Sequence, residues 1–191
     1  MVAAVVVTAM LSSASLEVSA DAYTYFASGE KTYVQPNFEL DYDWLHVELR
    51  HNYEALGAVS LWMGTGLHGG KKLTWSIIFM IGGVLGQDSG IAPGFEVELG
   101  WWRFDLFSQS EFVVFWSREE NSFFYNWSEL GFSPVDPLRL GAALQRTFVH
   151  AKRRDLEAGF FAGLRGFGLE LTAYVFDPPH PTVVLALGVG Q

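Results

Sequence analysis

The chain has 191 residues, of which 50% are hydrophobic and 16% aromatic, and this composition favours a membrane setting over a soluble domain. Its net charge of −9, from 12 basic and 21 acidic residues, excludes nucleic acid as a partner, because phosphate binding needs a basic surface. The absence of cysteine excludes disulfides, thiolate metal sites and a cysteine nucleophile.

Residues 1–14 are predicted to be a signal peptide. An apolar run at 2–11 is followed by small residues at 12–14, as in a signal core with its cleavage region. The Lys or Arg that ordinarily precedes such a run is missing, so a buried strand is the alternative use of this segment. No linker divides residues 15–191, which are predicted to form a single domain.

From residue 16 onward the sequence repeats segments of alternating polarity that are separated by clusters of turn formers. In 44–54, for example, Leu45 and Val47 alternate with His46 and Glu48, and a period of two belongs to a strand. No stretch reaches the roughly 18 to 20 apolar residues of a membrane-spanning helix, so a closed barrel is the remaining way to satisfy the backbone in lipid. Twelve strands are predicted, at 16–27, 32–41, 44–54, 57–67, 72–84, 92–101, 103–116, 123–133, 138–150, 155–165, 167–176 and 182–191.

The connections between these segments alternate between tight turns and longer polar links, which is typical of a barrel that crosses a membrane up and down. The predicted fold is therefore all-β, a transmembrane up-and-down antiparallel β-barrel of about 12 strands. A soluble sandwich or lipocalin-like barrel with its charged face outward is the alternative. Aromatic residues near predicted strand ends are expected at the headgroup level: Trp44, Trp75, Trp101 and Trp102 at one end, and Tyr53, Trp116, Phe123, Phe124 and Tyr174 at the other.

Several stretches of the sequence resemble porin-like outer-membrane β-barrel proteins of bacteria, and the resemblance covers most of residues 16–191. It implies a place in the bacterial outer membrane, contact with outer-membrane lipids and lipopolysaccharide, and insertion by the barrel-assembly machinery. It implies no substrate and no catalytic residues. The stretches that carry it are 46–54, 82–86, 90–94, 124–129 and 174–178.

Charged and amide residues on the polar faces of the segments are predicted to line a shared lumen. Their acidic excess would favour cations or small polar solutes over anions, which predicts a small porin or narrow channel. If the charges pair completely, the same residues form a closed structural barrel with a salt-bridged interior. The predicted lumen-lining residues are Glu48, Arg50, Glu96, Glu98, Arg103, Asp105, Glu111, Glu129, Gln145, Glu157, Arg165 and Glu170.

A membrane-embedded lipid hydrolase is a further alternative. Asn126, Ser128 and a histidine such as His51 or His150 could converge at the outer rim, although none lies in a recognised catalytic motif. The histidines also lack the spacing of a metal site, so the sequence predicts neither an enzyme, a metal site nor a cofactor.

Overall fold

The computed structural model describes residues 16–27, 29–149, 153–177 and 181–190; the predicted signal peptide lies outside them. Each strand contains the alternating polarity that the sequence displays, and the observed bounds lie within a few residues of the predicted ones. The elements are β1 (Leu16–Ala27), β2 (Tyr33–Tyr42), β3 (Leu45–His51), β4 (Val59–Gly70), β5 (Leu73–Leu85), β6 (Gly90–Trp101), β7 (Phe104–Phe115), η1 (Glu119–Asn121), β8 (Phe123–Val135), β9 (Leu138–Val149), β10 (Arg153–Gly166), β11 (Leu169–Phe176) and β12 (Thr182–Gly190).

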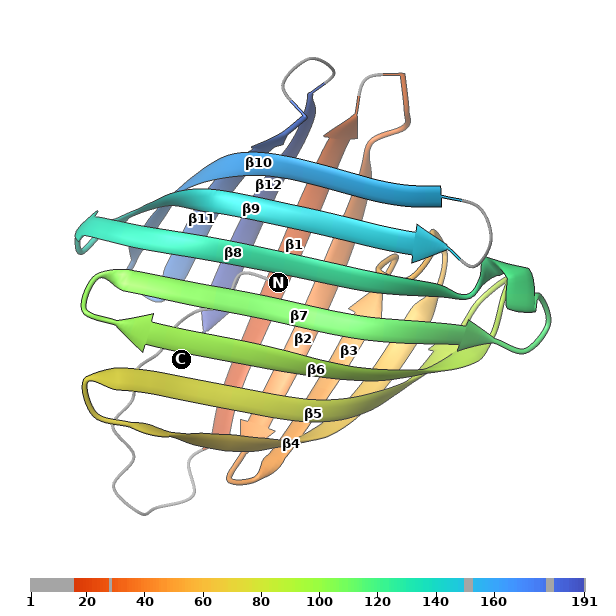
Figure 1. Cartoon of the computed structure of the whole chain (residues 1–191), viewed down its shortest axis with the longest axis horizontal. Helices are drawn as coiled ribbons and strands as arrows, with labels where there is room; N and C mark the ends of the chain where they lie inside the picture. Colours follow the sequence, from red (N-terminus) through yellow and green to blue (C-terminus); the bar gives the residue numbers. More distant parts are fainter. Residues whose placement is uncertain (1–15, 28, 150–152, 178–180, 191) are drawn as a thin grey trace.

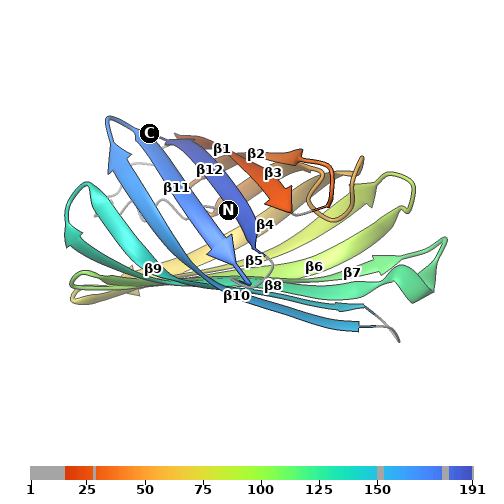
Figure 2. The same ribbon diagram turned by 90° about the horizontal axis from the view of Figure 1, so that it is seen from above.

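Every strand pairs antiparallel with its neighbour in the chain, and β12 pairs with β1 to close the barrel. Figures 1 and 2 show the result as two facing walls, in which β1, β2 and β12 cross steeply behind the broad wall that contains β5 to β9. No helix among the described residues is long and apolar enough to cross a membrane. The predicted twelve-stranded up-and-down barrel is confirmed.

The two ends of the barrel differ in their connections. At the turn end, each link between strands is two residues long, and the first residue of three of these turns, Asp43, Trp102 and Phe167, has a positive φ, as tight hairpin turns require. At the loop end, links extend to seven residues, as in 52–58 and 116–122. The turns at the turn end are 43–44, 71–72, 102–103, 136–137 and 167–168.

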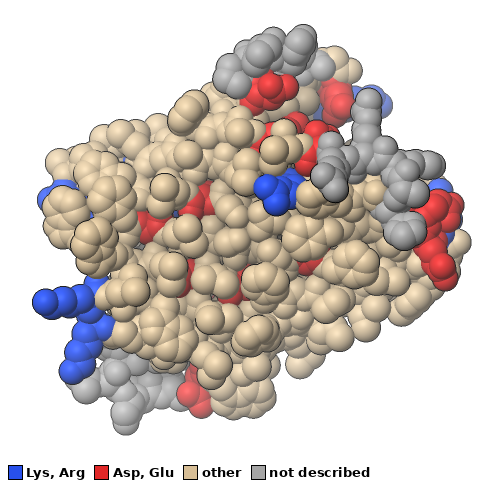
Figure 3. Space-filling view, viewed as in Figure 1, with Lys and Arg blue, Asp and Glu red and all other residues tan. Residues whose placement is uncertain are grey.

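The outward faces of the strands are apolar. Large hydrophobic side chains such as Leu61 (53% exposed) and Phe79 (54% exposed) point away from the barrel, while Glu48 and Arg50 are fully buried inside it. Figure 3 shows that uncharged side chains dominate the face over β5 to β9, and that most projecting charged ones gather toward the two ends. The soluble alternative is therefore wrong, because it requires the charged face to be outside.

The expected aromatic girdle is confirmed only in part. Trp44, Trp101 and Trp102 are exposed at the turn end, as the headgroup level requires. Tyr174, by contrast, is completely buried inside the barrel, and Phe123 lines an internal cavity. Both belong to the inward-facing set of their strands, so their place near a strand end did not decide which side they face.

Two apolar clusters fill much of the interior. The larger one packs Tyr23, Phe107, Trp127, Tyr174 and Phe176 together, and the smaller one is built around Trp62. The Trp62 ring lies directly over Gly82, its partner on β5: a Cβ at Gly82 would lie 2.4 Å from the ring. Glycine at this position is what lets the indole lie flat against the barrel wall.

Replacement of Gly82 by valine is expected to lower the free energy of unfolding by about 1 to 3 kcal/mol, because the added methyl groups displace a fully buried indole. Urea unfolding of the refolded barrel in detergent, followed by tryptophan fluorescence, measures the change. Gly83→Val is the matched control, since a Cβ at Gly83 meets nothing within 4 Å on the outward face. Equal loss of stability in both variants would contradict the packing role.

Candidate functional site

A cluster of charges around Arg50 occupies the middle of the barrel. The alternation of β3 turns His46, Glu48 and Arg50 inward, where each is buried. Arg50 contacts Glu48, and its Nη1 atom donates to Glu111 Oε2 at 2.9 Å, while its Nη2 atom lies 3.9 Å from Glu96 Oε1. Two strands on the facing wall, β6 and β7, thus supply carboxylates to one guanidinium on β3.

Aromatic rings complete the surroundings of Arg50. Its guanidinium carbon lies 4.4 Å from the centre of the Trp62 ring and 4.7 Å from that of Tyr53. Cation–π contact of this kind stabilises a charge that has lost its water. The arginine is therefore held in place by carboxylates and by aromatic rings, as a buried positive charge inside the barrel.

Polar contacts continue from Arg50 toward both ends of the barrel. Toward the turn end, the two ring nitrogens of His46 contact Glu48 Oε1 and Asp41 Oδ1, each at 2.8 Å, and the Asp41 side chain is 44% exposed. Toward the loop end, Gln109 Nε2 donates to Glu96 Oε1 at 2.8 Å and Tyr53 donates to Gln109 Oε1 at 2.5 Å. We call this series the polar chain; it consists of Tyr53, Gln109, Glu96, Arg50, Glu48, His46 and Asp41.

A second charged group centres on Arg139 of β9. Its Nη1 atom donates to Glu129 Oε2 at 2.6 Å, and its Nε atom donates to Asp105 Oδ2 at 3.0 Å. Glu129 Oε1 also accepts hydrogen bonds from Trp127 Nε1 at 2.9 Å and from the Tyr174 hydroxyl at 2.8 Å. The two charged groups meet on β7, which carries Glu111 of the first group and Asp105 of the second, and both groups are almost completely removed from solvent.

The other residues predicted to line the lumen lie in several places. Arg165 pairs with Glu170 at 2.9 Å near the turn end. Arg103 lies in the turn after β6, outside these groups, where it donates to the carbonyl of Ser133 at 3.1 Å. Glu98 and Glu157 are half-buried on the inward faces of β6 and β10. Within the described residues, no group of three or more His, Cys, Asp or Glu could hold a metal ion.

The sequence predicted a strand that continues to residue 54. Instead, β3 ends at His51 and the loop that follows it folds into the barrel. Asn52 adopts a φ of 60°, and its side chain binds the backbone of Val34 and Gly57 at 2.8 and 2.7 Å. The expectation that Tyr53 lies in an outer girdle is therefore wrong, because this turn brings it inside. Burial raises the pKa of Tyr53 well above its usual value, so its hydroxyl remains a donor.

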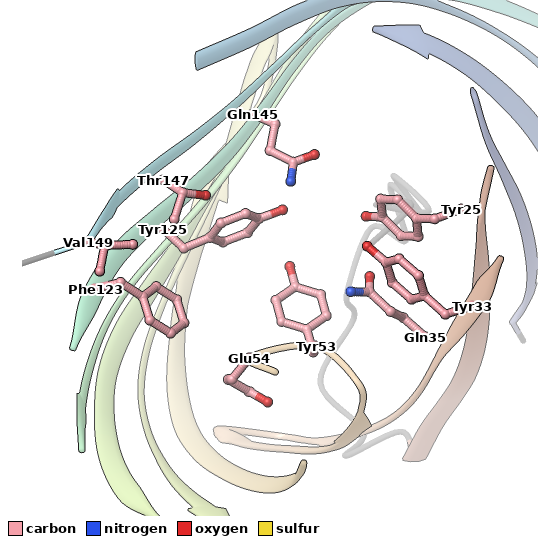
Figure 4. Close-up of a pocket in the computed structure, with 10 residues that line it drawn as sticks. All are labelled: Tyr25, Tyr33, Gln35, Tyr53, Glu54, Phe123, Tyr125, Gln145, Thr147 and Val149. Carbon is pink, nitrogen blue, oxygen red and sulfur yellow. The ribbon is translucent and has the colours of Figure 1, made fainter. Parts of the chain in front are cut away.

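An internal cavity of about 280 Å³ opens above this loop, at the loop end. Glu54 lies on its floor, where its Oε1 atom accepts hydrogen bonds from Ser60 at 2.5 Å and from Trp62 at 3.1 Å. Figure 4 shows the tyrosine hydroxyls and the two amide groups directed toward a common space. We call this cavity the vestibule; it is lined by Tyr25, Tyr33, Gln35, Tyr53, Glu54, Phe123, Tyr125, Gln145, Thr147 and Val149.

The hydrolase alternative is not favoured. Ser128 and Asn126 lie on the outward face of β8, where Ser128 Oγ bonds to Asn126 Oδ1 at 3.1 Å and to Ser108 Oγ at 2.9 Å. Among the described residues, no hydrogen bond links either side chain to a histidine. His51 is on β3, which four strands separate from β8, and His150 lies outside the described residues. The residues form a small polar patch on the membrane-facing wall, which also includes Ser110.

Sequence reasoning missed several of the residues that organise the interior. Arg139 alternates with Leu138 and Leu140 in a predicted strand, so the period of two was the signal that could have placed it inside. Tyr25 and Tyr125 follow the same rule on β1 and β8. The alternation in 44–54 put Glu54 on the same polar face as Glu48 and Arg50, but its place at the cavity depends on the inward fold of the loop after β3.

Comparison with known proteins supports the fold. No family model matches the sequence, and no curated protein matches it. The structure is similar to that of a KdgM porin in complex with disordered oligogalacturonate, with a TM-score of 0.62 and 8% identity over 91% of this chain and 98% of the porin chain. A second KdgM porin structure gives a TM-score of 0.58 at 7% identity, covering 91% and 98% of the two chains. OccAB4 from Acinetobacter baumannii gives 0.50 at 8% identity, over 88% of this chain and 56% of that one.

These likenesses show a shared architecture. The resemblance seen in the sequence is confirmed at this level: the chain has the closed-barrel fold of a porin.

Proposed function

We propose that this protein is a narrow channel of the porin type in the bacterial outer membrane, which passes cations or small polar solutes. Lipids and lipopolysaccharide surround its apolar wall, and the barrel-assembly machinery inserts it. The acidic excess of the interior favours cations over anions, because fixed charge in a low-dielectric pore selects the ions that enter. The channel carries out no covalent chemistry.

The polar chain is the observation that carries this proposal. It connects Tyr53, in the wall of the vestibule, to the exposed Asp41 at the turn end through hydrogen bonds and ion pairs, of which the Arg50–Glu96 pair, at 3.9 Å, is the longest contact. Burying this many charges is costly, and an apolar interior of the same volume would make an equally stable or more stable barrel. A row of polar and charged side chains through the interior is therefore better explained by a solute that moves along it, with side chains rotating aside as it passes.

A closed structural barrel is the second candidate, and the burial of the interior favours it. Arg50, Glu48 and Glu129 have almost no contact with solvent, so the interior of the resting structure is filled at their level. In this alternative the same ion pairs fix the shape of the barrel and conduct nothing.

Recordings from planar bilayers separate the two candidates. The refolded barrel is expected to give small, discrete conductance steps with a preference for cations over anions, measured from the reversal potential in a salt gradient. Folding of each sample is checked by its shift in gel mobility on heating. Barrels that are folded and inserted but carry no current would contradict the channel and support the structural barrel.

A further inference from the structure

The vestibule has the chemistry of a ligand site, and its polar groups define the ligand. Tyr25 and Tyr33 stack with ring centres 4.8 Å apart and planes 3° from parallel, while Tyr53 and Tyr125 meet edge to face at 5.8 Å. These contacts lock the four rings, which come from two opposite walls and from the loop after β3. In Figure 4 their hydroxyl groups, more than their ring faces, point into the shared space.

Two oxygen atoms at the vestibule lack a partner. Glu54 is 7% exposed, and its Oε2 atom is buried without a hydrogen-bond partner among the described residues; the same holds for Gln145 Oε1. A buried acceptor without a donor costs about 1 to 3 kcal/mol. Both oxygen atoms are closed off from the cavity in this structure, so a donor in the cavity reaches them once the side chain turns toward it, and that contact removes the cost. A ligand that brings hydroxyl groups to both positions supplies these donors.

The charge of the lining excludes an anionic ligand. None of the ten residues that line the vestibule is basic, and Glu54 is the one carboxylate among them. A sugar acid would place its carboxylate beside Glu54 with no cation to balance it. The oligogalacturonate in the similar porin structure is therefore a poor model for the ligand of this chain.

We propose that the vestibule binds a neutral mono- or disaccharide. This inference rests on the proposed function in one respect: if the barrel is a channel, the sugar is the solute that it passes. Sugar hydroxyls donate to Glu54 and Gln145 and exchange hydrogen bonds with the tyrosine hydroxyls that point into the cavity. A cavity of about 280 Å³ lies at the small end of ligand sites, which limits the ligand to one or two sugar rings.

Binding to the refolded full chain tests this site without any need for transport. Calorimetric titration uses glucose and maltose as neutral probes, galacturonate as the anionic probe and choline as an organic cation, in a polyoxyethylene detergent that carries no sugar headgroup. We expect saturable binding of a neutral sugar and none of galacturonate. Absence of sugar binding to folded protein, equal binding of galacturonate, or preferential binding of choline would overturn the proposal.

Two variants locate the binding, and two controls match them. Gln145→Leu removes an unpartnered acceptor and Tyr125→Phe removes one hydroxyl, and each is expected to weaken sugar binding roughly tenfold, since sites built for hydrogen bonds discriminate strongly against their loss. Gln87→Leu and Tyr42→Phe change the same residue types at exposed positions outside the vestibule and are expected to leave affinity unchanged. Equal losses in variants and controls would place the sugar elsewhere.

The outcome is separable from that of the channel proposal. If the protein carries a current that no sugar blocks and also binds no sugar, the channel proposal is supported and the saccharide site is contradicted. Sugar binding by a folded barrel that carries no current supports the saccharide site and contradicts the channel.

Discussion

The Arg139→Ala variant is expected to be less stable than the parent barrel by about 3 to 5 kcal/mol, because it leaves buried carboxylates without their cation. Arg139 is 3% exposed, and it joins Glu129 and Asp105 from β9 to the two preceding strands. It also lies 4.5 Å from the centre of the Phe161 ring on β10, so its loss affects four neighbouring strands. Chemical unfolding in detergent, followed by tryptophan fluorescence, measures the loss as a lower denaturant midpoint.

Two further variants make this expectation specific. Arg118→Ala removes an arginine whose side chain is 42% exposed and paired with Asp88 at the loop end, and an exposed pair of this kind contributes about 0 to 1 kcal/mol. The triple variant Arg139→Met, Glu129→Gln, Asp105→Asn removes the cation and both carboxylates together, and is expected to recover much of the stability. A similar loss in Arg118→Ala and Arg139→Ala would mean that the buried pairs have no special importance.

The Arg50→Ala variant is expected to conduct more than the parent barrel and to prefer cations more strongly, by on the order of tenfold in the ratio of cation to anion permeability. Its guanidinium occupies the centre of the interior and is the positive charge nearest to Glu48 and Glu111. Removing it widens the interior and leaves the acidic groups unbalanced, so the potential there becomes more negative. Single-channel conductance and reversal potentials measure the two effects.

Glu111→Gln gives the opposite charge change at the same place, and its cation preference is expected to fall. It also keeps the test informative if Arg50→Ala folds poorly. Arg103→Ala is the control, since this arginine lies in a turn and contacts Ser133 outside the polar chain. Folded Arg50→Ala and Glu111→Gln barrels with the conductance and selectivity of the parent would contradict a role for these charges in permeation.

The fold was largely predictable from the sequence, because the alternating polarity within each strand of a membrane barrel indicates which side chains face the lipid and which face the interior. In β3, for example, the apolar Leu45 and Val47 face outward and the polar His46 and Glu48 face inward, and this is evident without information on any other strand. Turn formers such as Asp43, with its positive φ, mark the tight turns in the same local way. The strand bounds followed from these signals to within a few residues.

The partners across the interior were not predictable in this way. Arg50 binds Glu111, 61 residues further along the chain, and that pairing depends on how the closed barrel brings β3 opposite β7. Tyr53 was misplaced because the chain leaves the strand at Asn52 and turns inward, where alternation no longer applies. The candidate lumen residues could thus be named, but the polar chain and the vestibule could not.

The seam between β1 and β12 has a consequence for how the protein is made. Each other pair of strands is adjacent in the sequence and joined by at most seven residues, so hairpins can form locally and quickly as soon as their residues are available. Pairing Ser19 with Gly190 instead requires almost the whole polypeptide to be present. Until then, the outer edges of β1 and β12 remain unpaired. The barrel is therefore most exposed to aggregation or to degradation in the interval before this seam closes.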